Sequence, residues 1–198
     1  PETASAKHNL ARLYWKRGDY ASAEPLYREA LETRRALGAS GALDAARTAH
    51  HLASTLQRLG RFDESVGMYE ESLAVRRATL GPDHPDVANT LNGLGECYGD
   101  QRVFDEALAR YEESHRIITA AVGADDWRTA SAAANVGRCL IELGREDEAE
   151  QQLARAQAAA RAPAPSHAQD QASATPRHVH QRRRGAVQQQ QQQQQQQR

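Results

Sequence analysis

The sequence predicts an all-α fold, a right-handed α-solenoid of about four stacked helix–turn–helix units, followed by a low-complexity tail. The first observation is a repeat of 42 residues: Gly18, Gly60 and Gly144 share one register, and aromatic residues follow two places later at Tyr20 and Phe62. A fixed period of this length is typical of stacked supersecondary units. Four further places keep the register: Leu10, Leu52, Leu94 and Val136; Ala23, Ser65, Ala107 and Ala149; Tyr27, Tyr69 and Tyr111; and Ala30, Ser72, Ser114 and Ala156.

The second observation is the pattern inside one unit. In residues 50–77, apolar residues recur at helical spacing on both sides of Gly60. They are Leu52, Ala53, Leu56 and Leu59 before the glycine, and Phe62, Val66, Tyr69 and Leu73 after it. Each unit is therefore a helix, a tight turn at a glycine that can adopt positive φ, and a second helix.

The shared register predicts where each helix begins and ends. The expected helices are 2–16, 20–36, 44–58, 62–79, 86–100, 104–121, 127–142 and 146–161, in units 1–42, 43–84, 85–126 and 127–161. Arg102 stands where the other units have the turn glycine, so we expect that turn to be less tight or to have negative φ. Glu146 and Leu153 replace aromatic residues, as expected of a terminal unit that drifts from the pattern.

These residues resemble the tetratricopeptide repeat. Its pattern of large, small and aromatic residues reads here as Leu10, Ala11, Tyr14, Gly18, Ala23, Tyr27 and Ala30. The longer 42-residue form, with the connector Gly-Pro-Asp-His-Pro-Asp-Val-Ala at 81–88, resembles the kinesin light chain repeat. The resemblance covers residues 1 to about 160. It implies a protein–protein interaction scaffold whose first helices line a concave groove for short peptides, and kinesin light chains accept acidic motifs that carry a tryptophan.

Both ends of the chain lead to expectations of their own. Pro1 aligns with the connector residue Pro85, so we expect the sequence to be part of a longer protein. Residues 162–198 have almost no bulky apolar residue and include ten consecutive glutamines at 188–197, which predicts a disordered tail. The tail is either a flexible interaction segment or a glutamine expansion without a role. Arg182, Arg183 and Arg184 form a basic patch there, which favours loose electrostatic contact over specific nucleic-acid recognition.

No catalytic chemistry is visible in the sequence. It has no glycine-rich phosphate loop, nucleophile elbow or spaced pair of catalytic carboxylates, so we expect no enzyme activity, no cofactor and no small-molecule substrate. Cys97 and Cys139 are one repeat apart and are expected to be buried, reduced and unbridged, which fits the cytoplasm. The histidines do not have the spacing of a metal site, so no metal is expected. No apolar run is long enough for a membrane helix.

The candidate binding surface is the groove side of the first helices. The candidates are Asn9, Arg12, Trp15, Lys16, Arg47, His50, Arg58, Asn89, Asn92, Asn135 and Arg138. The same counting also turns Ser5, His8, His51, Ser54, Gln57, Glu96, Asp100, Ser131 and Glu142 toward the groove. Units one and two are basic there and units three and four are mixed to acidic. The asparagine amides are suited to gripping a peptide backbone, and Trp15 is a candidate anchor.

The leading functional interpretation is an adaptor that holds a partner's linear peptide, with an acidic peptide favoured by the basic end of the groove. One alternative is a regulatory or sensor region of a larger multidomain protein, such as a nucleotide switch. A second is an enzyme whose catalytic group lies outside this sequence. A third, RNA binding, depends only on the tail arginines.

Overall fold

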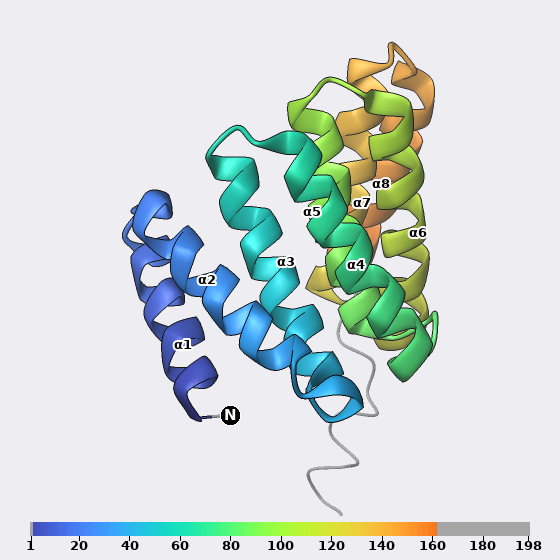
Figure 1. The fold of residues 1–198 in the computed structure, drawn as a ribbon. Coiled ribbons are helices and arrows are strands. Elements are labelled where there is room, and N and C mark those ends of the chain that lie inside the picture. The colour runs from blue at the N-terminus through green and yellow to red at the C-terminus, as the bar shows by residue number, and fades with distance from the viewer. Residues whose placement is uncertain (1, 162–198) are drawn as a thin grey trace, which may run out of the picture. The chain divides into compact units, whose positions relative to one another are not determined.

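The computed structural model describes residues 2–161 of the 198-residue chain. Within that range it has eight α-helices and one short 3-10 helix (Figure 1). The α-helices are α1 Glu2–Lys16, α2 Tyr20–Arg35, α3 Ala42–Arg58, α4 Phe62–Leu80, α5 Pro85–Asp100, α6 Phe104–Val122, α7 Trp127–Glu142 and α8 Glu146–Arg161, and the 3-10 helix is η1 Gly38–Gly41. The predicted disorder of 162–198 falls outside the described residues.

The helices form four antiparallel pairs that stack in chain order, α1 with α2 through α7 with α8 (Figure 1). Each second helix also packs on the first helix of the next unit, so every inner pair contacts a neighbour on each side. The predicted helix bounds differ from the observed ones by two residues at most. The all-α solenoid predicted from the 42-residue register is confirmed.

The turn inside each pair has the same backbone geometry in all four units, and here one prediction is wrong. Arg102 has a φ of 63°, close to the 75° of Gly60. The amide of Arg102 donates to the carbonyl of Gly99 at 2.9 Å, and the amide of Val103 donates to the carbonyl of Tyr98 at 2.9 Å. This pair of bonds closes the helix end and needs a left-handed residue, whichever side chain it carries. The turn is therefore as tight as the others, and Arg102 adopts the glycine conformation.

Aromatic side chains from the second helices fill the space between units. Tyr69 is 2% exposed, and its ring lies so close to Gly93 that a Cβ there would be 2.7 Å from it. Tyr111 approaches Gly95 inside its own unit, between α6 and α5, with a Cβ distance of 2.9 Å. Glycine in α5 is thus required by the close approach of these rings, and the aromatic register seen in the sequence sets the spacing between units.

Side chains also cap the helices after the connectors. His84 precedes α5, and its Nδ1 accepts a hydrogen bond from the amide of Asp86 at 3.0 Å. Asp126 caps α7 in the same way through the amide of Arg128 at 2.8 Å. The first connector instead forms η1 and ends in Gly41, where a Cβ would meet the carbonyl of Arg34 at 2.3 Å.

Cys97 and Cys139 are both free and buried, as the sequence predicted. They occupy equivalent places in α5 and α7, and each thiol faces a backbone carbonyl at the start of the preceding second helix. Cys97 Sγ lies 3.8 Å from the oxygen of Phe62, and Cys139 Sγ lies 3.1 Å from that of Phe104. Burial raises the pKa of both thiols. They therefore act as small core residues.

Candidate functional site

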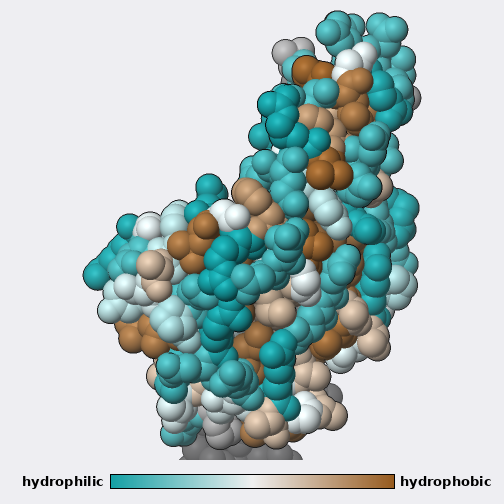
Figure 2. Space-filling model, turned by 45° about the horizontal axis from the view of Figure 1, so that its top comes forward, coloured by the Kyte–Doolittle hydropathy of each residue, from teal (hydrophilic) through white to brown (hydrophobic). Residues whose placement is uncertain are grey.

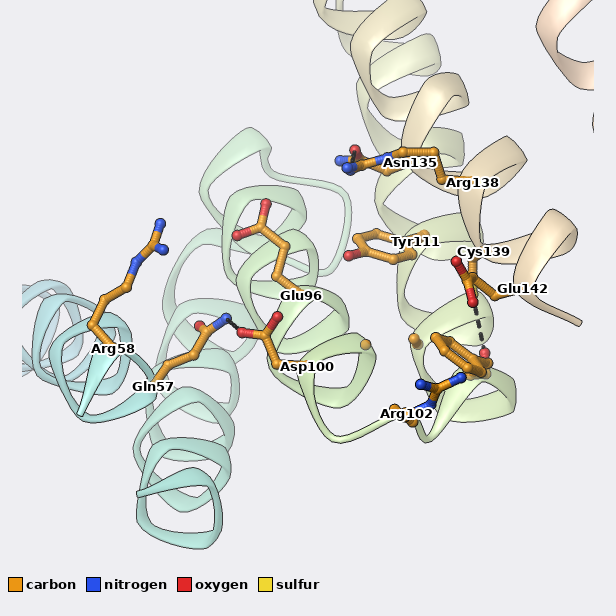
Figure 3. A pocket seen from close by; sticks show the side chains of 13 residues that line it. Gln57, Arg58, Glu96, Asp100, Arg102, Tyr111, Asn135, Arg138, Cys139 and Glu142 are labelled. Atoms are coloured by element: carbon orange, nitrogen blue, oxygen red, sulfur yellow. Dashed lines mark hydrogen bonds between the residues drawn. The ribbon is translucent and has the colours of Figure 1, made fainter. Parts of the chain in front are cut away.

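A pocket of about 520 Å³ opens along the first helices of units two to four (Figure 3). Helices α3, α5, α6 and α7 all contribute to its walls. The side chains that carry its chemistry are Gln57, Arg58, Glu96, Asp100, Arg102, Tyr111, Asn135, Arg138 and Glu142. Charged groups of both signs from separate repeats thus surround one pocket. The stacking of the units brings these groups together.

Three arginines of this pocket keep their charged groups available. Among the residues that the structure describes, Arg58, Arg102 and Arg138 take part in no ion pair. Nearby, Gln57 Nε2 donates to Asp100 Oδ2 at 2.7 Å and ties α3 to α5 (Figure 3). The protein surroundings desolvate the carboxyl of Glu96 and raise its pKa. The pocket therefore offers guanidinium groups that no carboxylate neutralises, beside a carboxyl group that is easier to protonate than usual.

A relay of side-chain hydrogen bonds runs along one wall of the pocket. Arg138 donates to Asn135 Oδ1, and Asn135 Nδ2 donates to Asn92 Oδ1 at 2.6 Å. Asn92 Nδ2 then donates to Glu96 Oε1 at 2.8 Å. Each amide donates and accepts at once, so the relay fixes the orientation of both asparagines.

A second pocket, of about 350 Å³, lies between α5, α6 and α7 toward the other end of the same helices. It shares the lining residue Asn135 with the first pocket, so the two pockets adjoin at this side chain. Its walls include Asn89 and Asn92 from α5 and the exposed ring of Trp127 at the start of α7. The candidate site is thus a groove of two adjoining pockets over units two to four.

The structure brings together about half of the residues predicted for the groove. Arg58, Asn135 and Arg138 line the first pocket, and Asn89 and Asn92 line the second together with Asn135. The other candidates lie outside both pockets: Asn9, Arg12, Trp15, Lys16, Arg47 and His50. The predicted residues of unit four therefore meet those of unit three, whereas α1 contributes to neither pocket.

The remaining basic candidates are exposed on α1 and α3. Asn9, Arg12 and Lys16 are exposed along α1. Arg47 is exposed on α3 and pairs with Asp44 at 2.7 Å. Their side chains make a basic surface beside the pockets.

Trp15 does not stand free as an anchor would. It is half-buried, packs on the core that units one and two share, and meets Tyr20 edge-on with ring centres 6.1 Å apart. Its Nε1 is buried and has no hydrogen-bond partner among the described residues. Trp15 thus contributes to the packing of this core.

The histidines correct a second expectation, because His8 does not face the groove. It is 4% exposed, its ring meets that of Tyr27 at 5.3 Å, and His51 stacks on the same tyrosine at 5.9 Å. His50 meets Tyr69 at 5.3 Å. Burial is the main cause that lowers the pKa of His8 and His50 to about 3 and that of His51 to about 4. The three rings form one neutral aromatic cluster between units one and two. His8, which was expected to face the groove, is covered by the ring of Tyr27.

Several lining residues escaped the sequence reasoning. Tyr111 was identified only as part of the repeat register and Arg102 only as a turn residue, yet both line the first pocket. Trp127 was not among the candidates, although it is 75% exposed and lines the second pocket. An exposed tryptophan in the place of the connector proline was a signal that could have been used. Among residues 2–161, no group of three or more His, Cys, Asp or Glu side chains is placed to hold a metal.

In the part of the chain that the structure describes, no helix has the length and apolar character to span a bilayer. Models of the tetratricopeptide repeat match residues 3–40, 44–120 and 96–162. No curated protein sequence matches the chain.

Two solved structures share the fold. BtubC (BKLC) from P. vanneervenii has a TM-score of 0.72 at 23% identity, over 82% of this chain and 66% of that one. The chain thus spans just under two thirds of BtubC. A putative kinesin light chain with nearly identical TPR-like repeats from Podosopora anserina has a TM-score of 0.71 at 21% identity, over 78% of this chain and 73% of that one. The chain belongs to the tetratricopeptide repeat family, with a fold of the kinesin light chain type.

Proposed function

We propose that this repeat scaffold is an adaptor that binds a linear peptide of a partner protein along the first helices, with an acidic segment of the peptide over the basic side chains of units one and two. The observation that carries the proposal is the groove of two adjoining pockets, with the hydrogen-bond relay from Arg138 to Glu96 between them. Oriented amides can donate to peptide carbonyls and accept from peptide amides, whatever the peptide sequence.

The charges favour an acidic peptide at one end. Among the described residues, Arg12, Lys16 and Arg58 take part in no ion pair, so their charges are available to a partner. Complementary charge speeds association and selects partners more than it adds affinity. The basic side chains would therefore select peptides, and the amide relay would hold their backbone.

The surface fits a small, polar contact. The face seen in Figure 2 is mostly hydrophilic, and its hydrophobic side chains lie in small patches between hydrophilic ones. Obligate interfaces are larger and more apolar than this. A peptide that is released again is therefore a better match than a permanent subunit, and we place the adaptor in the cytoplasm as a binding protein without catalysis.

Charge reversal tests the proposal. In Arg12→Glu/Arg58→Glu, a library of acidic peptides should bind more slowly and at least about tenfold more weakly than to the parent, as expected for lost charge complementarity. The advantage of the parent should shrink as salt rises, because charges are screened within about 8 Å at physiological ionic strength. The matched control is Arg35→Glu/Arg116→Glu, which changes the net charge equally on the second helices α2 and α6. If both double variants bind every peptide as the parent does, the acidic-peptide adaptor is wrong.

A further inference from the structure

A buried arginine closes the contact between units one and two. Arg34, in the last turn of α2, is 3% exposed and lies between α1 and α3. Its Nη1 donates to the carbonyl of Asp44 at 3.2 Å and to the hydroxyl of Thr48, and lies 3.2 Å from His8 Nδ1. Its Nη2 donates to the hydroxyl of Ser5 at 3.4 Å. The guanidinium thus finds acceptors on both first helices.

The contact between units two and three repeats this arrangement one period later. Arg76 is 5% exposed, and its Nη1 donates to the carbonyl of Asp86 at 2.7 Å and to Thr90 Oγ1 at 2.8 Å. Arg76, Asp86 and Thr90 stand 42 residues after Arg34 and its two partners on α3. At two successive contacts, therefore, a buried arginine side chain fills the space between units and its guanidinium donates hydrogen bonds there.

The contact between units three and four lacks both the buried arginine and the threonine that accepts its hydrogen bond. Ile118 stands in the arginine place and Ala132 in the threonine place. The pocket of about 350 Å³ lies here, and both residues line it. The places equivalent to the other residues that Arg34 contacts are Asn89, Asn92 and Arg128, and these line it too. The second pocket is therefore the space that an arginine side chain fills at the other two contacts.

The pocket keeps groups that suit a guanidinium. Asn89 and Asn92 offer amide oxygens where unit one has a hydroxyl and an imidazole nitrogen. Asp86 also lines the pocket, and among the described residues no arginine or lysine forms an ion pair with its carboxylate. The ring of Trp127 is 75% exposed at the rim, which suits stacking with a guanidinium.

The one basic group of the lining is already paired. Arg128 Nε donates to Asp126 Oδ1 at 2.8 Å, and its Nη2 donates to Asp126 Oδ2 at 2.9 Å. The Asp126 carboxylate therefore neutralises Arg128, and the carboxylate of Asp86 leaves the lining of the pocket with a net negative charge.

We propose that this second pocket takes an arginine side chain of the bound peptide, in the position that Arg34 and Arg76 hold at the other contacts. This inference deepens the proposed function and rests on it for the peptide that carries the arginine. Asn135 lines both pockets, so a peptide held by the amide relay passes the mouth of the second one. The ligand then has an acidic segment over units one and two and an arginine over units three and four.

Titration of the ¹⁵N-labelled chain with N-acetyl-arginine methylamide tests the pocket directly. The expected result is a saturable shift of the Trp127 indole and of the Asn89 and Asn92 side-chain amides. The norleucine analogue, which has an apolar side chain of similar length, should bind at least about tenfold more weakly, because it leaves the amide oxygens and the carboxylate unpaired. Equal binding of norleucine, or the absence of a saturable shift, would overturn the proposal.

Variants drawn from the chain itself sharpen the test. Ile118→Arg/Ala132→Thr restores the pair found at the other contacts, so it should fill the pocket and abolish the response to the arginine probe. Trp127→Ala changes an exposed side chain and should weaken probe binding at unchanged melting temperature, as should Asp86→Asn. If the filled variant is folded and still binds the probe, or if both single variants bind as the parent does, the pocket does not take arginine.

The two proposals can fail separately. If the arginine probe does not bind while Arg12→Glu/Arg58→Glu still weakens acidic peptides, the arginine pocket is wrong and the adaptor function stands. If the probe binds and the charge reversal has no effect, the acidic-peptide function is wrong and the pocket stands.

Discussion

Asn135 Nδ2 donates a hydrogen bond to Asn92 Oδ1 at 2.6 Å, across the contact between units three and four. The bond lies where two pockets adjoin, since Asn135 lines both of them. A side-chain bond between adjacent first helices makes the groove geometry depend on how the units stack. Substitutions that change the stacking should therefore alter binding without touching the groove.

The left-handed turn residue gives the first prediction. Arg102→Gly should raise the free energy of unfolding by about 1 kcal/mol, because glycine adopts positive φ without the Cβ penalty. Loss of the contact between the guanidinium and the Phe104 ring, 5.8 Å from its centre, offsets part of this gain. Urea unfolding followed by circular dichroism measures the difference. The matched control Gly60→Arg should lower stability by a similar amount, and a destabilised Arg102→Gly would contradict the account.

The close approach of Tyr69 to α5 gives the second prediction. Gly93→Ala places a Cβ 2.7 Å from the buried ring and should cost about 1–3 kcal/mol through overpacking. Gly67→Ala is the control, since nothing lies within 4 Å of the added carbon and α4 gains helix propensity. The control should be up to about 1 kcal/mol more stable than the parent. Equal stability of the two variants would mean that the ring does not set the spacing.

The histidine cluster gives a pH prediction. The folded pKa of His50 is lowered to about 3, chiefly by burial, against an ordinary value of 6.5. The fold therefore favours the neutral ring, so stability is complete above pH 6.5 and falls as the pH drops from 6.5 toward 3. At pH 5 this single group should cost about 2 kcal/mol. His8 and His51 add to the loss.

His50→Phe removes one titrating ring and should reduce the loss between pH 7 and pH 5 by about 2 kcal/mol, measured by urea unfolding at each pH. The groups that face the three rings are the guanidiniums of Arg12, Arg34, Arg47 and Arg76 and the phenols of Tyr27 and Tyr69. All of the charged groups among them are cationic, so none stabilises a protonated ring. A parent stability that is the same at pH 7 and pH 5 would contradict the buried, neutral cluster.

The cysteines give a prediction on reactivity. Cys97 and Cys139 are buried and burial raises the pKa of both thiols, so neither should react with a thiol reagent in the native protein at neutral pH. Both should react at once in denaturant. Fast labelling of either thiol in the native state would show that the packing between units opens readily.

The sequence predicts the fold almost completely because the fold is periodic. Aromatic and small residues in one register fix helix bounds, turns and packing, and the structure reproduces them. The backbone of Arg102 could not be predicted from residue type, because two hydrogen bonds of the helix end impose its φ. Such a bond pattern depends on the geometry of the turn.

The candidate site was predicted in part, for a physical reason. Helical counting gives the direction of a side chain but not what covers it, so His8 was placed on the groove although it is buried beside Tyr27. The second pocket arises from two residues that are too small for their places, Ile118 and Ala132. A comparison of equivalent positions in all units, including positions outside the repeat motif, would have revealed Ile118 and Ala132.

The most direct test of the central claim is where a peptide touches the scaffold. In ¹⁵N-labelled protein with a saturating acidic peptide, the side-chain amides of Asn92 and Asn135 should shift, because both belong to the relay that lines the groove. Exposed amides on the second helices α2 and α4, which line neither pocket, should stay in place. Shifts confined to α2 and α4, with Asn92 and Asn135 unchanged, would contradict peptide binding in the groove.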